Sequence, residues 1–352
     1  MCSVRQAIPL MPHATFICPH AFRPRQFEYH PTLPHLMVLG TMSGEVVVLN
    51  HLTGHIVRRI QMSRGPVHTR DLPVLGLCWL RRSPSLMISG CENGSLSLFD
   101  IDAPLGTDGG TRSTSFEDFP QLTSVHANCT DDLFLVSGYS NDVGLYDIAT
   151  TRRTNTFRNV HSEHINVLKF SNHNPNIFAT SSFDRDVKLW DLRQGASSPI
   201  FARRSNAGNV MVCFSDDDRH LLCSAVDNEV RQYGTGDGQL MTLFDLKPLG
   251  SEHNYTRSYY LNGSEYIIVG SCDENVVRVL CARSGRQLRD VPLDPSTGFP
   301  SLYVQSLRGD PFRPFHFSVL VARTDPQEPS QVVSVNLLRS QEHFGVMDIA
   351  SR

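Results

Sequence analysis

The sequence predicts an all-β fold, a single-domain β-propeller with seven blades. Three observations predict it: a hairpin block that recurs along the chain, a spacing of one block per propeller blade, and an absence of helical periodicity. The chain has 352 residues, of which 40 % are hydrophobic and 19 % are charged, as in globular proteins. Closed β architectures of this length often form one domain.

Each block contains an apolar pair, small residues, a turn rich in Asn, Asp, Gly or Ser, an alternating apolar strand, and a final polar residue. Clear copies occupy residues 37–50, 87–100, 135–147, 178–191, 222–234 and 268–281, and a weaker copy ends at Asn336. The block ends at 50, 100, 147, 191, 234, 281 and 336 are 43 to 55 residues apart. Propeller repeats of about 40–45 residues, lengthened by loop insertions, explain this spacing.

Each block is expected to fold as a β-hairpin, because Asp, Asn and Gly tolerate the backbone of tight turns. Alternation such as Val46 and Val48 marks a strand packed between neighbours. An earlier strand precedes each hairpin, and these first strands are predicted at 26–30, 76–80, 122–126, 166–171, 210–215, 257–261 and 304–307. With an irregular outer strand, each unit becomes a four-stranded blade, and closing the ring removes exposed sheet edges.

The predicted organisation has three parts. Residues 1–22 form an N-terminal extension, and a segment near 14–22 completes the seventh blade. Residues 23–340 form the propeller, and residues 341–352 form a C-terminal tail.

The fourth block resembles the consensus of the WD-repeat family. His161 stands nine residues before Phe170, and Ser182, Asp184 and Trp190 follow at the spacing of the family. The resemblance implies a hydrogen-bonded tetrad in which Asp184 orients His161, His161 meets Ser182, and Ser182 meets the Trp190 indole. A buried indole N–H needs such a partner. The other blades replace the tryptophan by Leu49, Phe99, Tyr146, Tyr233, Leu280 and Val335.

Residues 178–193 read FATSSFDRDVKLWDLR. This segment resembles the box of DWD-box WD-repeat proteins, which dock on the damaged-DNA-binding adaptor of cullin-4 ubiquitin ligases. The resemblance implies that Asp191 and Arg193 contact the adaptor and that Trp190 holds them in place. A guanidinium suits this role because its rigid fork makes bidentate hydrogen bonds. We expect Arg193 to be exposed and free of an internal acidic partner, and an internal salt bridge would favour a scaffold without a ligase role.

Residues 25–31 and 40–45 are distantly similar to the first blade of the small damaged-DNA-binding subunit, which is itself one of these receptors. Two departures limit the likeness. Pro9, Pro12 and Pro19 disfavour the N-terminal helical hairpin of such receptors, and the aromatic wedge that enters damaged duplex has no counterpart. Recognition of DNA damage is therefore not expected.

The expected function is a protein-interaction scaffold, as the substrate receptor of a cullin-4 RING ligase, with an unknown protein substrate. The alternative is a WD-repeat scaffold in a chromatin, RNA-processing or trafficking complex. We expect no enzymatic activity and no cofactor, because no catalytic residues converge in the sequence. No metal site is expected either: His161 belongs to the tetrad, and Glu163, His164 and His173 sit on turns and strand ends.

The net charge of −3 disfavours nucleic acid as a partner, although arginine pairs such as Arg81-Arg82 leave contacts with phosphates open. No apolar run reaches the length of a membrane span, and no secretory signal is recognisable, so we expect an intracellular protein of the nucleus, the cytoplasm or both. The nine cysteines fit a reducing compartment.

Lysine is scarce. Lys169, Lys188 and Lys247 are the only lysines among 32 basic residues. Codon bias towards arginine explains this, and so does avoidance of lysine beside a lysine-modifying machine. Both explanations stay open.

Overall fold

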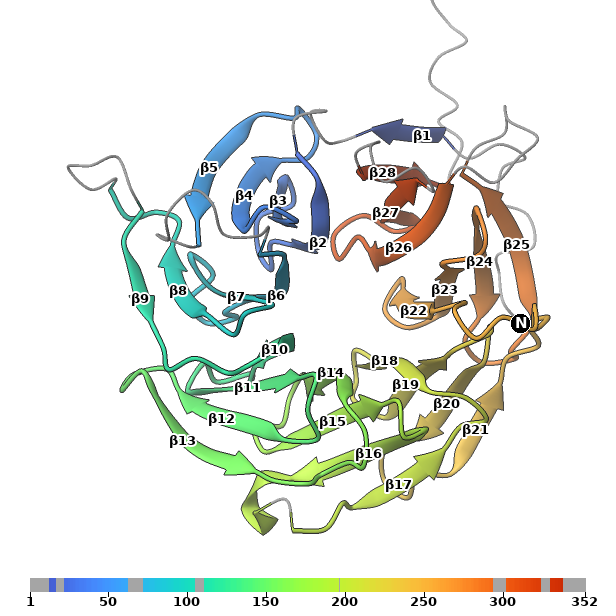
Figure 1. Cartoon of the computed structure of the whole chain (residues 1–352). Coiled ribbons are helices and arrows are strands. Elements are labelled where there is room, and N and C mark those ends of the chain that lie inside the picture. Colours follow the sequence, from blue (N-terminus) through green and yellow to red (C-terminus); the bar gives the residue numbers. More distant parts are fainter. Residues whose placement is uncertain are drawn as a thin grey trace, which may run out of the picture.

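The chain folds into a ring of seven four-stranded antiparallel sheets, which confirms the predicted β-propeller (Figure 1). The computed structural model describes residues 13–16, 22–62, 72–104, 111–195, 197–293, 302–323 and 330–337. In every blade except the seventh, four consecutive strands pair in chain order, from the centre of the ring to its outside.

The strands of the first four blades follow the predicted blocks closely. Blade 1 comprises β2 (Pro24–Tyr29), β3 (Leu36–Thr41), β4 (Glu45–Asn50) and β5 (Ile56–Gln61). Blade 2 comprises β6 (Val74–Trp79), β7 (Leu86–Cys91), β8 (Leu96–Asp100) and β9 (Ser113–Ser115). Blade 3 comprises β10 (Leu122–Ala127), β11 (Leu133–Gly138), β12 (Val143–Asp147) and β13 (Arg152–Phe157). Blade 4 comprises β14 (Ile165–Phe170), β15 (Ile177–Ser182), β16 (Asp186–Asp191) and β17 (Phe201–Arg204).

The last three blades complete the ring. Blade 5 comprises β18 (Asn209–Phe214), β19 (His220–Ala225), β20 (Val230–Gly234) and β21 (Leu240–Leu243). Blade 6 comprises β22 (Thr256–Leu261), β23 (Tyr266–Ser271), β24 (Val276–Cys281) and β25 (Gln287–Pro292). Blade 7 comprises β26 (Leu302–Gly309), β27 (His316–Arg323) and β28 (Gln331–Asn336), with β1 (His13–Phe16) as its outer strand.

The two ends of the propeller chain meet in blade 7. Strand β1 pairs antiparallel with β28, in a register that sets His13 opposite Asn336 and Phe16 opposite Val333. Residues close to the N-terminus thus cover the outer edge of a sheet built from the C-terminal strands (Figure 1). Residues 1–12, 17–21 and 338–352, which include the predicted C-terminal tail, lie outside the described residues.

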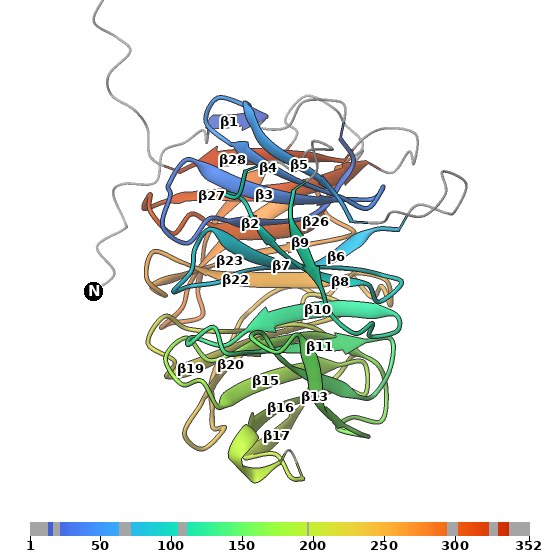
Figure 2. The same cartoon turned by 90° about the vertical axis from the view of Figure 1, so that its left-hand side faces the viewer.

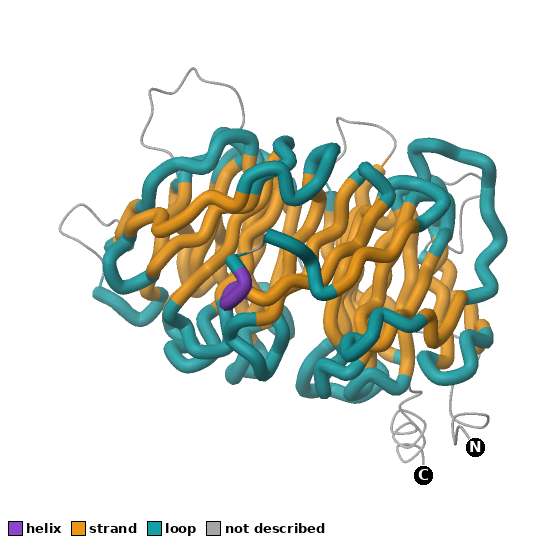
Figure 3. The backbone as a smooth tube through the Cα atoms, turned by 90° about the horizontal axis from the view of Figure 1, so that it is seen from below, coloured by secondary structure: helices purple, strands orange, loops and turns teal. Residues whose placement is uncertain are grey.

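The strands cross the ring between two faces that carry the loops, as the side views show (Figures 2 and 3). We call the face with the turns between the second and third strand of each blade the top face. The turns between the first and second strand lie on the opposite, bottom face. One 3₁₀ turn, η2 (Leu192–Gln194), follows β16 on the bottom face. Within the described residues, no helix has the length and apolar character that crossing a bilayer requires.

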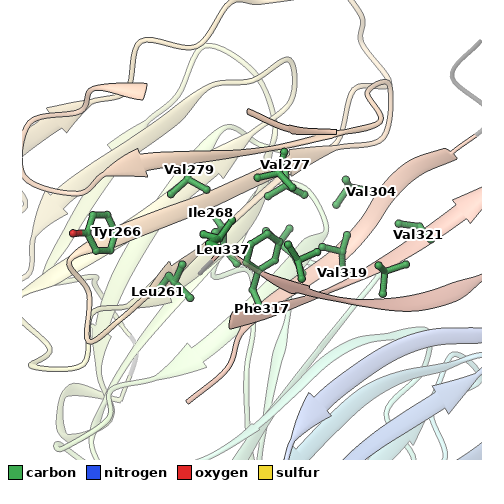
Figure 4. Close-up of a cluster of buried hydrophobic side chains, with 14 residues drawn as sticks. Leu261, Tyr266, Ile268, Val277, Val279, Val304, Phe317, Val319, Val321 and Leu337 are labelled. Carbon is green, nitrogen blue, oxygen red and sulfur yellow. The ribbon is translucent and has the colours of Figure 1, made fainter. Parts of the chain in front are cut away.

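The core lies between blades rather than at the centre of the ring. Between blades 6 and 7, side chains of both sheets interdigitate, and Val277 and Val279 pack on Phe317, Val319 and Val321 (Figure 4). Leu320, between the last two, packs in the cluster shared with blade 1. Successive strand residues face opposite sides of a sheet, so a sheet buried on both sides needs a continuous apolar run. Each buried aliphatic side chain contributes about 1.5–3 kcal/mol to stability.

Candidate functional site

The candidate site is the hairpin of β15 and β16 in blade 4. Its register sets Phe178 opposite Trp190 and Ile177 opposite Asp191. The turn at Phe183–Asp184 therefore lies on the top face, and Asp191 and Arg193 lie at the bottom face. Trp190 is only 3 % exposed and stacks on Phe178, with ring centroids 6.2 Å apart.

A chain of hydrogen bonds crosses blade 4, but its hydroxyl member is Thr180. His161 Nδ1 donates to Asp184 Oδ2 at 2.8 Å, and His161 Nε2 accepts from Thr180 Oγ1 at 2.7 Å. The Trp190 indole N–H donates to the same hydroxyl oxygen at 2.9 Å. This pattern assigns the imidazole proton to Nδ1.

The prediction that Ser182 joins this tetrad is therefore wrong. Ser182 Oγ donates instead to the backbone carbonyls of Glu163 and His164, at 3.1 and 2.9 Å. The reason is distance along the strand: Trp190 is opposite Phe178, so Thr180 is two residues from it and Ser182 four. Each residue adds about 3.3 Å, which puts Ser182 out of reach of the indole. The predicted hydrogen bond between Asp184 and His161 is observed, whereas His161 and Trp190 both bond to Thr180 in place of Ser182.

Asp184 anchors the top end of the tetrad. Its carboxylate also accepts the backbone N–H groups of Ser162 and Asp186, at 3.0 and 2.8 Å. Burial raises the pKa of Asp184, but the hydrogen bond from His161 and those from the backbone N–H groups outweigh burial and hold that pKa well below its usual value. The carboxylate therefore stays ionised at neutral pH and keeps the imidazole in one orientation.

At the bottom end, Asp191 and Arg193 are joined to each other. Asp191 caps η2 by accepting the backbone N–H of Arg193 at 3.0 Å, and Gly195 ends the turn with a left-handed backbone (φ 66°). The Arg193 side chain folds back on the same carboxylate, with Nε 2.9 Å from Oδ1 and Nη2 2.6 Å from Oδ2. The Arg193 hydrogen bond is the main cause that lowers the pKa of Asp191.

Of the two expectations for Arg193, exposure to solvent and freedom from an internal acidic partner, only the first is met. The Arg193 side chain is 67 % exposed, whereas that of Asp191 is 7 % exposed. The expectation that Arg193 is free of an internal acidic partner is wrong, because a residue two positions away in a tight turn lies within reach. The internal pair was the observation named in favour of the scaffold alternative. The guanidinium itself lies in solvent, however, and the pair leaves Nη1 without a partner among the described residues.

The family model described as "Nucleolar protein 10-like, N-terminal domain", a β-propeller, matches residues 13–277 of this chain, which is more than half of its length. The chain belongs to the nucleolar protein 10-like propeller family. The WD-repeat features of blade 4, with the W-D-x-R ending of the DWD type, lie inside the matched range.

Curated relatives of this nucleolar protein 10-like propeller include longer proteins. The chain is 58 % identical over 325 residues to "Protein DWD HYPERSENSITIVE TO UV-B 1" of Arabidopsis thaliana, covering 91 % of this chain and 41 % of that relative. It is 24 % identical over 203 residues to the U3 small nucleolar RNA-associated protein 15 homolog of Gallus gallus, covering 47 % of this chain and 38 % of that relative. It is 28 % identical over 104 residues to the ribosome biogenesis protein WDR12 homolog of Culex quinquefasciatus, covering 29 % of this chain and 24 % of that relative. The chain thus spans less than half the length of each of these relatives.

The bottom face of the nucleolar protein 10-like propeller also carries contacts between blades that the sequence did not reveal. Asp218, in the first turn of blade 5, accepts from Ser171 Oγ and from the backbone N–H groups of Asn172 and His173 in blade 4, at 2.6 to 2.8 Å. Asp131 of blade 3 accepts three backbone N–H groups of blade 2, from Arg81 to Ser83. Both aspartates have a left-handed backbone, with φ of 57° and 61°. We call these two contacts the interblade latches.

The lysines of this nucleolar protein 10-like propeller differ in accessibility. Lys188 Nζ donates to the backbone carbonyl of Val160 at 2.8 Å, and Lys169 lines a cavity inside the ring. Both are partly buried, and only Lys247 is exposed. The described surface therefore offers one freely accessible lysine amine.

Proposed function

We propose that this propeller is a substrate receptor of a cullin-4 RING ubiquitin ligase, and that Trp190, Asp191 and Arg193 dock on its damaged-DNA-binding adaptor. The observation that carries the proposal is the W-D-x-R ending at the bottom of blade 4, with its guanidinium in solvent. The Arabidopsis relative, whose name includes DWD, supports it at 58 % identity over most of this chain.

Each residue has a distinct part in the proposed contact. Trp190, held by Thr180 and Phe178, keeps the end of β16 in place. Asp191 caps η2 and orients the Arg193 side chain, so that the rotamer is set before binding. The remaining guanidinium edge of Arg193 then donates to an acceptor on the adaptor. Preorganisation of this kind lowers the entropy cost of binding.

In this role the propeller catalyses no reaction itself. It raises the effective concentration of substrate lysines near the charged ubiquitin carrier. A receptor in that position is exposed to the same carrier, and an arginine-rich surface with one exposed lysine, Lys247, presents few acceptors for ubiquitin.

The test is a pull-down of the adaptor with the purified propeller and its Arg193→Ala variant. We expect the variant to keep the melting temperature of the parent and to bind the adaptor about tenfold to a hundredfold more weakly, because charge-assisted hydrogen bonds across the interface are lost. Arg204→Ala is the matched control. Arg204 lies in the same blade, is 60 % exposed, and also pairs with an aspartate, Asp186. Equal binding by both variants at the parent's strength would falsify the docking role.

A second candidate function is a scaffold in an RNA-processing assembly. The matching family is named after a nucleolar protein, and two relatives of lower identity are named for small nucleolar RNA and for ribosome biogenesis. The Arg193–Asp191 pair also favours it, since that pair partly satisfies the guanidinium internally. Co-purification with pre-ribosomal particles that is unchanged by Arg193→Ala would support this candidate over the ligase role.

A further inference from the structure

The first strands of all seven blades enclose a cavity of about 270 Å³ on the axis of the ring. Its lining carries four cations, Arg25, Lys169, Arg257 and Arg308, and a single carboxylate, Glu28. Arg308 donates hydrogen bonds to that carboxylate, with Nη2 and Nε at 2.8 and 3.0 Å from Glu28 Oε1. The guanidinium of Arg308 also lies 4.1 Å from the ring centroid of Tyr259. The ion pair of Arg308 and Glu28 is therefore part of the cavity wall. The cavity retains an excess of positive charge.

Arg25 and Arg257, which we call the arginine pair, lie near the top of this cavity. Each stands at the start of a first strand, Arg25 in β2 and Arg257 in β22. Arg25 Nη1 is buried and has no hydrogen-bond partner among the described residues. Arg257 Nε donates to the backbone carbonyl of Gln305 at 2.9 Å. No carboxylate is hydrogen-bonded to either guanidinium in the described part of the chain.

An arrangement of two neighbouring cations inside a protein is costly. Burial and then repulsion by Arg257 lower the pKa of Arg25, which means that its charged form is poorly compensated. An anion placed between the two guanidinium groups would remove that repulsion and would satisfy the buried donor.

Four rings lie beside the arginine pair on the same face, and we call them the aromatic rim: Tyr139, His164, Phe183 and Tyr255. His164 stacks on Phe183 with centroids 4.5 Å apart, and Tyr139 and Tyr255 follow on either side at 5.5 and 6.0 Å. Gly208 makes room for Phe183, because a Cβ there would lie 2.6 Å from the ring. Tyr139 is 49 % exposed, so the rim presents an aromatic surface to solvent.

We propose that the top mouth of the ring binds an acidic peptide segment of a partner protein. An Asp or Glu side chain enters the cavity and bonds to the arginine pair, and a neighbouring apolar side chain packs on the aromatic rim. The peptide site deepens the proposed receptor function. It rests on that function in one respect only, namely that the peptide is part of a substrate. Phe183 and Arg193 lie at opposite ends of one hairpin, so that peptide and adaptor bind on opposite faces at the same time.

The positions of the charges favour a peptide over nucleic acid. The cations converge within one cavity, whereas a nucleic-acid strand requires a track of cations along its phosphates. The chain as a whole has a net charge of −3, which repels a polyanion but not a short segment with one or two carboxylates.

The test is selection of a random nonapeptide phage library on the full chain, followed by fluorescence polarisation with the selected peptides. We expect enrichment of peptides with Asp or Glu beside an apolar residue. We expect the Arg25→Gln/Arg257→Gln variant to bind them at least tenfold more weakly. Phe183→Ala should weaken binding as well, and a peptide with Gln in place of its acidic residue should lose affinity. Arg204→Gln, which removes an exposed charge at the outer edge of blade 4, is the control and should bind as the parent does.

Each outcome decides the proposal. Selection without acidic enrichment, or selected peptides that bind the double variant as tightly as the parent, overturns it. Tighter binding of a dodecauridylate probe than of any peptide, lost in the double variant, also overturns it and favours nucleic acid at the same mouth. Melting curves show whether the double variant is folded, and the single variants repeat the measurement if it is not. Arg193→Ala should keep peptide affinity and the double variant should keep adaptor binding, so the two proposals fail separately.

Discussion

At the scale of single residues, blade 4 shows how a two-residue difference changes a role. Thr180 and Ser182 lie on the same face of β15, and both carry the hydroxyl that a tetrad needs. Only Thr180 reaches both the imidazole of His161 and the indole of Trp190. The motif alone could not distinguish them, because the choice depends on the strand register and on the direction in which the tryptophan ring leans.

Thr180→Val tests this assignment. The substitution keeps the shape of the side chain but leaves His161 Nε2 and the Trp190 indole without their shared partner inside the blade. We expect the free energy of unfolding to fall by about 2–4 kcal/mol, measured by urea denaturation. Thr180→Ser keeps the hydroxyl and should cost only about 1 kcal/mol for the lost methyl group. Similar losses in both variants would show that the hydroxyl is unimportant.

At the scale of strands and turns, the hairpins could be predicted and the contacts between them could not. The turn residues at 183–186, the apolar start of β15 and the apolar alternation in β16 mark this hairpin without any knowledge of the neighbouring blade. The interblade latches join residues that are about one repeat apart, and an aspartate in a polar turn looks the same in sequence whether or not it reaches the next blade. The pairing of Arg193 with Asp191 was missed for a related reason, since the backbone of η2 decides whether the side chain folds back.

Asp218→Ala tests the latch between blades 4 and 5. The variant loses three hydrogen bonds to the carboxylate and places alanine at a positive φ. We expect a loss of about 1–3 kcal/mol in unfolding free energy by calorimetry. Asp218→Asn, which tolerates that backbone and keeps one carbonyl acceptor, should lose less. Asp216→Ala, two residues away and exposed, should change stability by less than about 0.5 kcal/mol. An equal loss for Asp216 and Asp218 would contradict the latch.

At the scale of the whole molecule, the ring could be predicted because every blade has the same packing requirement, and this requirement leaves a repeat in the sequence. Sheets packed on both sides require apolar residues at successive positions, and this requirement survives in blades that have lost their tryptophan. The central cavity was not predicted. Its lining residues come from all seven blades, and each contributes only one or a few positions that look unremarkable along the chain.

Burial of cysteine and tyrosine side chains in the ring also determines how the stability of the fold changes at alkaline pH. Burial raises the pKa of Cys91 to about 11, that of Cys213 to about 12 and that of Tyr146 to about 12, from ordinary values of 9.0 for cysteine and 10.0 for tyrosine. The folded state therefore keeps protons that the unfolded state releases. Stability from these groups is fully present below about pH 9 and is lost as the pH rises through 9 to 12, by up to about 1.4 kcal/mol per pH unit for each group.

Thermal melts between pH 7 and pH 11.5 measure this effect. We expect the melting temperature to fall steeply above about pH 9, and the fall between pH 10 and 11.5 to be shallower in Tyr146→Phe. The contribution of Asp184, whose pKa is lowered, is separate: it is present above about pH 4 and is lost only in acid. A melting temperature that stays constant up to pH 11.5 would show that these side chains reach water in the folded state.

The partnership of β1 with β28 has a consequence for how the molecule is made. Among the strands of the propeller, β1 is synthesised first, and its partner β28 is synthesised only after the strands of the other six blades. Until then β1 has no sheet to join, and the seventh blade cannot be finished however well the earlier blades have formed. Closure of the ring is therefore a late event, which joins the first and the last strand of the propeller to be synthesised.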